Sequence, residues 1–77
     1  NPFNPTTTLS VELNTETYVS MKVFNVMGQL IEVIAEGSMN GGTHVITWDA
    51  SQLPSGIYLI HTEAGNTIHQ QKVMLLK

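Results

Sequence analysis

Short runs of alternating apolar and polar residues, each followed by a turn signal, constrain the fold of this chain most strongly. A period of two is typical of half-buried β-strands, and no stretch shows the longer period of an amphipathic helix. The runs expected as strands are Thr7–Leu13, Thr17–Asn25, Leu30–Ala35, Thr43–Asp49, Gly56–Glu63 and Thr67–Leu76. Such strands, with turn signals at intervals of about 8–12 residues, predict an all-β fold, an antiparallel β sandwich of six to seven strands.

The alternation also predicts which side chains share a face of each strand. The sets expected together are Leu9, Val11 and Leu13; Val19, Met21 and Val23; Ile31, Val33 and Ala35; and His44, Ile46 and Trp48. Ser20 and Lys22 are expected on the outer face of the second strand. The four methionines are expected to fill gaps in the core, because an unbranched thioether adapts to irregular space.

Turn residues lie between these runs. Val26–Gln29 is expected to turn at Gly28, which accepts a positive φ without steric cost. Gly37–Gly42 is expected as a loop in which Asn40-Gly41 favours a hairpin. Ala50–Ser55 is expected as a surface connection. Before the first strand, residues 1–5 indicate an extended lead-in or the end of a linker, because residues that precede proline avoid the helical region.

The last two runs predict a hairpin with a specific register. A two-residue loop at Gly65-Asn66 would pair Tyr58 with Val73, Ile60 with Gln71, and Thr62 with His69, and on the other face Ile57 with Met74 and Leu59 with Lys72. The hairpin would be polar near its turn and apolar on both faces near the chain end. We therefore expect Val73–Leu76 to be buried or to present apolar surface to a partner.

Length and charge exclude several classes of function. A chain of 77 residues is expected to form one domain, residues 1–77, without a second lobe. It has no cysteine and carries a net charge of −3 with no arginine, so disulfides are excluded and nucleic acid is not an expected partner. No apolar run approaches the ~20 residues of a membrane span, and no membrane insertion is expected. The chain starts without methionine, so we expect it to be a piece of a longer protein.

No motif indicates catalysis, and we expect no enzyme, no cofactor and no metal. The three histidines lack metal-ligand spacing, and no nucleophile elbow is present. Asp49 is expected to form a local turn with the residues that follow it. Trp48 is expected in the core, although an aromatic platform for sugars is an alternative. Tyr58 is expected to be a buried ring whose hydroxyl bonds to the backbone.

Several segments together carry a family resemblance. They are Asn1-Pro-Phe-Asn-Pro-Thr-Thr-Thr, Val19–Gln29 with its turn at Gly28, Gly42-Thr43-His44, Trp48-Asp49, Leu53-Pro54-Ser55-Gly56-Ile57-Tyr58, and the closing Lys72-Val73-Met74-Leu75-Leu76-Lys77. In this order and spacing the chain resembles the type A C-terminal sorting domain of the type IX secretion system. Thr62 and His61 depart from it, since the family often has leucine and a basic residue there.

The resemblance implies an immunoglobulin-like sandwich that directs a cargo, N-terminal in the same chain, through the periplasm and across the outer membrane. The cargo would then be released or attached at the cell surface, commonly after a surface protease removes the domain. The implied signal residues are Lys72, Val73, Met74, Leu75, Leu76 and Lys77, and the implied structural motif is Gly28, Trp48, Asp49, Gly56 and Tyr58. Strand addition to the edge of Thr67–Leu76 is the expected mode of recognition.

Other functions stay open at this point. The Ig-like domain of flagellar hook-capping proteins shares several of the same elements, but it usually has a longer connection than Ala50–Ser55. A structural spacer in a surface protein belongs to the same class of alternative. A carbohydrate-binding appendage is the third hypothesis, after sorting and a structural module, and it would gain support if Trp48 were exposed beside another aromatic ring. Dimerisation through an edge strand also stays open. A chain that continues past Lys77 would weaken the sorting hypothesis.

Overall fold

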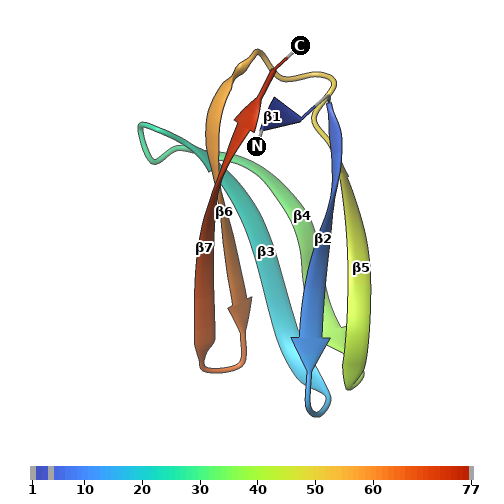
Figure 1. The fold of residues 1–77 in the computed structure, drawn as a ribbon. Coiled ribbons are helices and arrows are strands. Elements are labelled where there is room, and N and C mark those ends of the chain that lie inside the picture. Colours follow the sequence, from blue (N-terminus) through green and yellow to red (C-terminus); the bar gives the residue numbers. More distant parts are fainter. Residues whose placement is uncertain (1, 4, 77) are drawn as a thin grey trace.

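The computed structural model describes residues 2–3 and 5–76, with side chains from residue 5 onward. Within this part of the chain every regular element is a strand (Figure 1). The strands are β1 (Pro2–Phe3), β2 (Thr6–Leu13), β3 (Thr17–Asn25), β4 (Leu30–Met39), β5 (Gly42–Asp49), β6 (Gly56–Ala64) and β7 (Thr67–Leu75). The predicted all-β class is therefore confirmed. The described residues therefore include no helix that is long and apolar enough to cross a membrane.

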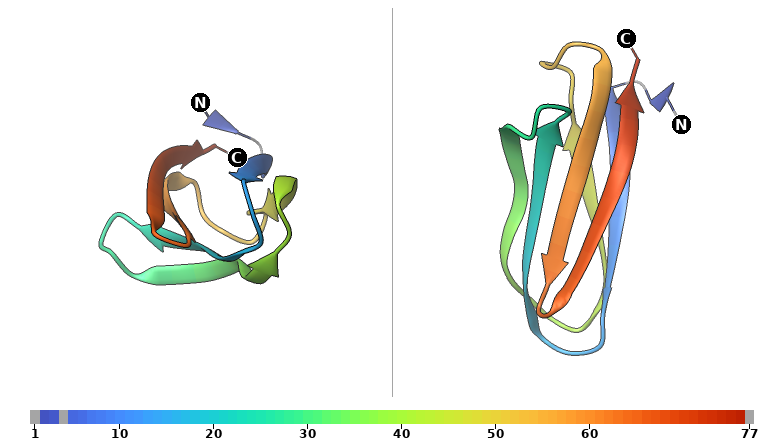
Figure 2. Two further views of the ribbon diagram at one scale, coloured as in Figure 1. Left: turned by 90° about the horizontal axis from the view of Figure 1, so that it is seen from below. Right: turned by 90° about the vertical axis from the view of Figure 1, so that its left-hand side faces the viewer.

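The strands form two sheets that pack as a sandwich. The larger sheet has the order β1-β7-β6-β3-β4, and β2 pairs with β5 in the smaller one. Every pairing is antiparallel except that of β1 with β7, which is parallel. Viewed along the strands, the two sheets enclose a common interior (Figure 2). The predicted β sandwich is confirmed, and its core is filled from both sheets.

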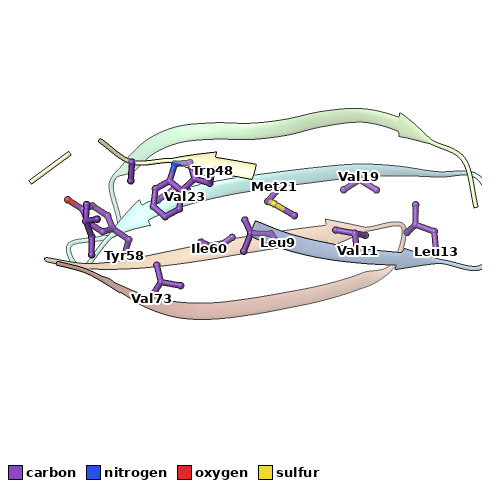
Figure 3. Close-up of a cluster of buried hydrophobic side chains, with 12 residues drawn as sticks. Leu9, Val11, Leu13, Val19, Met21, Val23, Trp48, Tyr58, Ile60 and Val73 are labelled. Carbon is purple, nitrogen blue, oxygen red and sulfur yellow. The ribbon is translucent and has the colours of Figure 1, made fainter. Parts of the chain in front are cut away.

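The core consists mainly of the alternating apolar side chains that the sequence singled out. Figure 3 shows them pointing into the space between the sheets. The buried apolar residues are Leu9, Val11, Leu13, Val19, Met21, Val23, Trp48, Ala50, Tyr58, Ile60, Val73 and Leu75. Burial of such side chains supplies most of the folding free energy of a domain this small, at ~25 cal/mol for each Å² of apolar surface removed from water.

The predicted register of the last hairpin is confirmed. Tyr58 pairs with Val73 and Ile57 with Met74, and the pairing continues to Ala64 and Thr67 beside the turn. Since the side chains of a strand alternate between faces, this register places Val73 inside the sandwich and Met74 outside. The segment Val73–Leu76 is thus partly buried and partly an exposed apolar surface. Val73 and Leu75 are buried, whereas Met74 and Leu76 are exposed.

The predicted strand Leu30–Ala35 was too short, and its face assignment was wrong for Val33, although Ile31 and Ala35 both pack against the core as expected. Strand β4 continues to Met39, and its pairing with β3 shifts register at two points. Each shift places an extra residue in β4, which breaks the simple alternation of faces. Val33 is therefore exposed, while Ile34 packs against the core beside Ala35. Periodicity alone cannot reveal a bulge, because the extra residue has no sequence signature of its own.

The expected hairpin at Asn40-Gly41 is also wrong. These residues connect β4 to β5, which lie in different sheets, so the chain crosses from one sheet of the sandwich to the other there.

The connection Ala50–Ser55, expected at the surface, begins with a buried residue. Ala50 is 1% exposed, and its backbone N–H donates to the carbonyl of Pro5 at 2.7 Å.

One expectation about side chains, that all four methionines fill the core, was wrong. Met21 is buried and Met39 is partly buried, but Met27 and Met74 are exposed, so only half of the methionines contribute to the core. Ser20 points outward as expected, but the neighbouring strands cover it, and its side chain is 8% exposed.

The N-terminal lead-in is extended where it is described, since Pro2–Phe3 forms β1. Asn1, Asn4 and Lys77 lie outside the described residues.

Candidate recognition surface

Tyr58, near the start of β6, connects that strand to the chain segment just before it. Its hydroxyl donates to the carbonyl of Pro54 at 2.7 Å, as expected from the sequence. Gly56, at the start of β6, has a φ of +157° and lies against the ring, with the position of a Cβ 4.0 Å from Cε2 of Tyr58. The hydroxyl thereby fixes the turn that leads into β6, and β6 in turn positions the terminal strand β7.

Removing this hydroxyl should weaken the domain measurably. We expect Tyr58→Phe to lower the free energy of unfolding by about 0.5–1.5 kcal/mol, because the carbonyl of Pro54 loses a protein donor while the ring keeps its packing. Urea denaturation of the variant and the parent protein measures the difference. A variant as stable as the parent would show that the bond to Pro54 contributes nothing net.

Trp48 and Asp49 end β5 and fix the connection that follows it. Trp48 is buried, its indole N–H donates to Oε1 of Glu32 at 3.2 Å, and its ring meets that of Tyr58 edge to face at 6.3 Å. Oδ1 of Asp49 accepts the backbone N–H of Ser51 at 2.9 Å, and this hydrogen bond holds the pKa of the carboxyl below its ordinary value. The expected local turn at Asp49 is confirmed.

Gly28 forms the turn between β3 and β4, as predicted. Its φ is +83°, a conformation that residues with a side chain rarely adopt. Its N–H donates to the carbonyl of Asn25 at 3.0 Å, and Oδ1 of Asn25 accepts the backbone N–H groups of Met27 and Gln29. The turn therefore holds the first residue of β4, Leu30, next to the end of β3.

Apolar side chains gather on the outer side of the larger sheet, near the end where β7 finishes. Strand pairing places Phe24 beside Leu30 and Leu59, and Ile57 beside Met74. Because paired residues share a face of a sheet, these five side chains lie together. We call this set, with Leu76 just beyond the strand, the outer apolar face. Leu30 is 53%, Met74 44% and Leu76 56% exposed.

The surroundings of the outer apolar face are polar. Lys72 pairs with Leu59 at its border. Farther along β6, His61 packs edge to face against the ring of Phe24 at 6.2 Å, and its Nε2 lies 3.6 Å from Oε1 of Glu63. An exposed apolar set bordered by charged residues is typical of a docking surface for another macromolecule.

The predicted signal residues divide between this surface and the interior. Lys72, Met74 and Leu76 are exposed at the outer apolar face or its border, whereas Val73 and Leu75 belong to the core. The face also includes Phe24, Leu30, Ile57 and Leu59, which sequence reasoning did not assign to a site. The only signal for them in the sequence was that they are apolar although the alternation of each strand places them on its outer face.

The edge of β7 is less open than the sequence suggested. Strand β1 pairs with it, Pro2 opposite Met74 and Phe3 opposite Leu75. The apolar end of β7 therefore already has a strand neighbour on each side. An added strand could reach only Thr67–Val73 without displacing β1. The expected mode of recognition, strand addition at the terminal residues, thus has to compete with β1.

The described residues offer little for the alternative chemistries. They contain no group of three metal-ligating side chains, and His61 and His69 lie on opposite faces of their hairpin, since His61 pairs with Gln70 and Thr62 with His69. The condition that would favour a sugar platform is not met, because Trp48 is 1% exposed.

Comparison with family models decides between the remaining possibilities. A model described as secretion system C-terminal sorting domain matches residues 1–76, which is nearly the whole chain. The chain belongs to this family. Searches of curated proteins and of solved structures each found no match. The predicted resemblance to the type IX sorting domain is thereby confirmed, and the family's motifs have the placements described above for Gly28, Trp48, Asp49, Gly56 and Tyr58.

Membership gives the sorting domain a general role. It implies a signal at the C-terminal end of a longer chain, an N-terminal cargo, and export through the type IX machinery to the cell surface or the extracellular space. Of the two departures from the family pattern, His61 lies beside Phe24, at the border of the outer apolar face. Thr62 lies on the opposite side of β6, facing the interior of the sandwich.

Proposed function

We propose that this sorting domain is a non-catalytic signal that the type IX machinery reads at the outer apolar face and at the terminal residues Lys72–Lys77. The single observation that carries the proposal is the exposure of Met74 and Leu76 at the end of a strand whose alternate residues are buried. The terminal segment has apolar residues on both its inner and its outer side, and only those on the inner side are buried in the core.

Physical considerations support recognition at this face. Docking two apolar surfaces removes both from water, at ~25 cal/mol for each Å². Most of the face lies on strands paired within one sheet, so the backbone that presents these side chains needs no ordering on binding. Lys72 at the border adds a positive charge to a domain whose net charge is −3, and it would favour one orientation of an acidic partner.

The proposed route has three steps. The cargo enters the periplasm, the sorting domain brings it to the outer-membrane translocon, and a surface protease then removes the domain, or the cargo is attached to the surface. Family membership motivates each of these steps. The domain itself needs no reacting group for any of them, because binding alone selects the cargo for transport.

A reporter fusion tests the sorting role. The domain Asn1–Lys77 is attached to a periplasmic reporter that carries a signal peptide, in a host with the type IX apparatus. We expect the reporter at the surface or in the medium only when the domain is present. A second fusion ends at Leu75, the last residue of β7, and so keeps the core residues Val73 and Leu75. We expect it to be exported at least about tenfold less, because it lacks the exposed apolar end of the signal.

Circular dichroism and protease resistance of the shortened fusion provide the folding control. If the complete fusion stays in the periplasm, the sorting role is wrong in that host, and a structural Ig-like module becomes the better description. If the shortened and complete fusions are exported equally, the domain sorts its cargo but the signal does not include Leu76 and Lys77.

A further inference from the structure

An open groove runs between the two sheets along one side of the sandwich. It has a volume of about 880 Å³ and lies between β2 and β7, with residues of β3 and β6 also in its walls. The apolar part of its lining includes Leu9, Val11, Leu13 and Met21, and its polar part includes Glu12, His69 and Gln71. Strands β2 and β7 are not paired with each other, so the groove separates two strand edges.

Both edges have backbone groups that the described strands do not pair. Strand β2 pairs only with β5, and along Thr67–Val73 strand β7 pairs only with β6. The outward N–H and C=O groups of such edges readily accept an additional strand. The inward side chains of β7 reflect the opening, since Val73 and Leu75 are buried whereas His69 and Gln71, on the same face, are exposed.

Strand β1 lies beyond one end of the groove, since it pairs with Met74 and Leu75 while the groove reaches Gln71 on β7. It lies on the edge of β7 and continues into β2 in the opposite sheet, as Figures 1 and 2 show. Its pairing with β7 is parallel, with Pro2 opposite Met74 and Phe3 opposite Leu75. An extended chain that arrives at Pro2 in this direction must therefore come along the edge of β7 from the side of Thr67, which is the length of the groove.

We propose that the segment that joins the cargo to this domain lies in this groove as an extension of β1, parallel to β7 and antiparallel to β2. The inference needs a segment ahead of Asn1, which the family's C-terminal position supplies, and it does not depend on the terminal signal proposed above. If the register of Pro2 opposite Met74 continues, the second residue before Asn1 would lie opposite Gln71 and the fourth opposite His69.

This placement fits the lining of the groove. Successive residues of a strand point to opposite sides, so alternate residues of the segment would cover Leu9, Val11 and Leu13, and the others would face solvent. The segment competes with no existing strand, unlike an addition beside Met74. Because it belongs to the same chain, its effective concentration at the groove is high, on the order of millimolar for a short connection.

Hydrogen exchange of the full-length protein, followed by mass spectrometry, tests the placement. The parent is compared with a variant that has proline at alternate positions of the segment, since proline cannot donate to a strand ladder. We expect the alternate amides of Leu9–Leu13 and Thr67–Gln71 that point into the groove to exchange at least about tenfold faster in the proline variant, because they lose strand partners. Amides of Val19–Val23, in the central strand β3, should be unchanged and control for global unfolding.

A disulfide test checks the register independently. The chain has no cysteine, so one cysteine is placed at the second residue before Asn1 and a second by Gln71→Cys. Neighbouring strands lie at a spacing that a disulfide can bridge, and we expect an intramolecular bond on mild oxidation. Gln70→Cys is the matched control. Gln70 pairs with His61 on the outer side of the sheet, so its bond should form at most about a tenth as often.

The proposal is wrong if exchange at Leu9–Leu13 and Thr67–Gln71 is the same in the parent and the proline variant. It is also wrong if Gln71→Cys and Gln70→Cys form the bond equally, or if protection appears only at high protein concentration, which would assign the groove to a second copy of the chain. None of these results bears on export, so failure here is distinguishable from failure of the sorting role.

Discussion

Replacing Trp48 with alanine is expected to lower the free energy of unfolding by about 3–5 kcal/mol, the range found when a large aromatic side chain is removed from a packed core. Trp48 is 1% exposed and lies at the contact between the two sheets (Figure 3). It donates to Glu32 on β4 and packs edge to face on Tyr58 of β6. The alanine variant loses both contacts and leaves a cavity between the sheets.

The size of the domain makes this loss severe. At ~0.05–0.15 kcal/mol per residue, a chain of this length has a total stability of about 4–12 kcal/mol, and small domains bury a lower fraction of their surface than large ones. The variant should therefore populate the unfolded state substantially at room temperature. Denaturant unfolding followed by circular dichroism gives the free energy for the variant and the parent protein.

Two further variants separate packing from nonspecific effects of substitution. Trp48→Phe keeps a ring in the core and loses only part of the volume and the N–H donor, so its loss should be clearly smaller. Val45→Ala changes a residue of the same strand that is 68% exposed, and it should change stability by no more than about 0.5 kcal/mol. Equal losses for Trp48→Ala and Val45→Ala would contradict the assignment of Trp48 to the core.

The parts of the fold that sequence predicted well are those governed by strict alternation. Strands β2, β3 and β6 present one apolar residue in every two to the core, and the compact turn at Gly65-Asn66 set the register of β6 and β7. A one-residue slip would have moved Val73 out of the core and Met74 into it, so burial and turn geometry specify the same pairing.

The errors arose where tertiary context overrides local pattern. The bulges of β4 depend on how it pairs with β3, and no turn or spacing signal marks them. Asn40-Gly41 favours a hairpin locally, but the chain at that point passes from one sheet to the other. The packing of the whole sandwich decides which strands become neighbours. Local sequence patterns in a single chain do not predict that order.

The candidate site was predicted only in part for a similar reason. The terminal residues Met74 and Leu76 were identified from the sequence, because they close the chain with an apolar run. Phe24 and Leu30 come from β3 and β4 and join Leu59 only through strand pairing. The groove between β2 and β7 was not predicted at all, since it depends on two strands that are far apart in the sequence and are not paired with each other.

Replacing Met74 and Leu76 together with serine is expected to reduce export of the reporter fusion by roughly 100-fold while the fold stays intact. Each exposed apolar side chain that a partner buries contributes about 1–2 kcal/mol, and a combined loss of ~2.7 kcal/mol in binding corresponds to a factor of about 100. The same change should lower the free energy of unfolding by less than about 1 kcal/mol, because both side chains are exposed in the free domain.

Ile68→Ser is the matched control for this double variant. Ile68 is also an exposed apolar residue of β7, at 60%, and its pairing with Glu63 places it on the same side of the sheet. It lies at the opposite end of the strand from Met74, outside the outer apolar face. Export of the Ile68→Ser fusion should match the parent. If both variants lose export equally while folded, general surface apolarity rather than this face is recognised, and if neither loses export, the machinery reads another part of the domain.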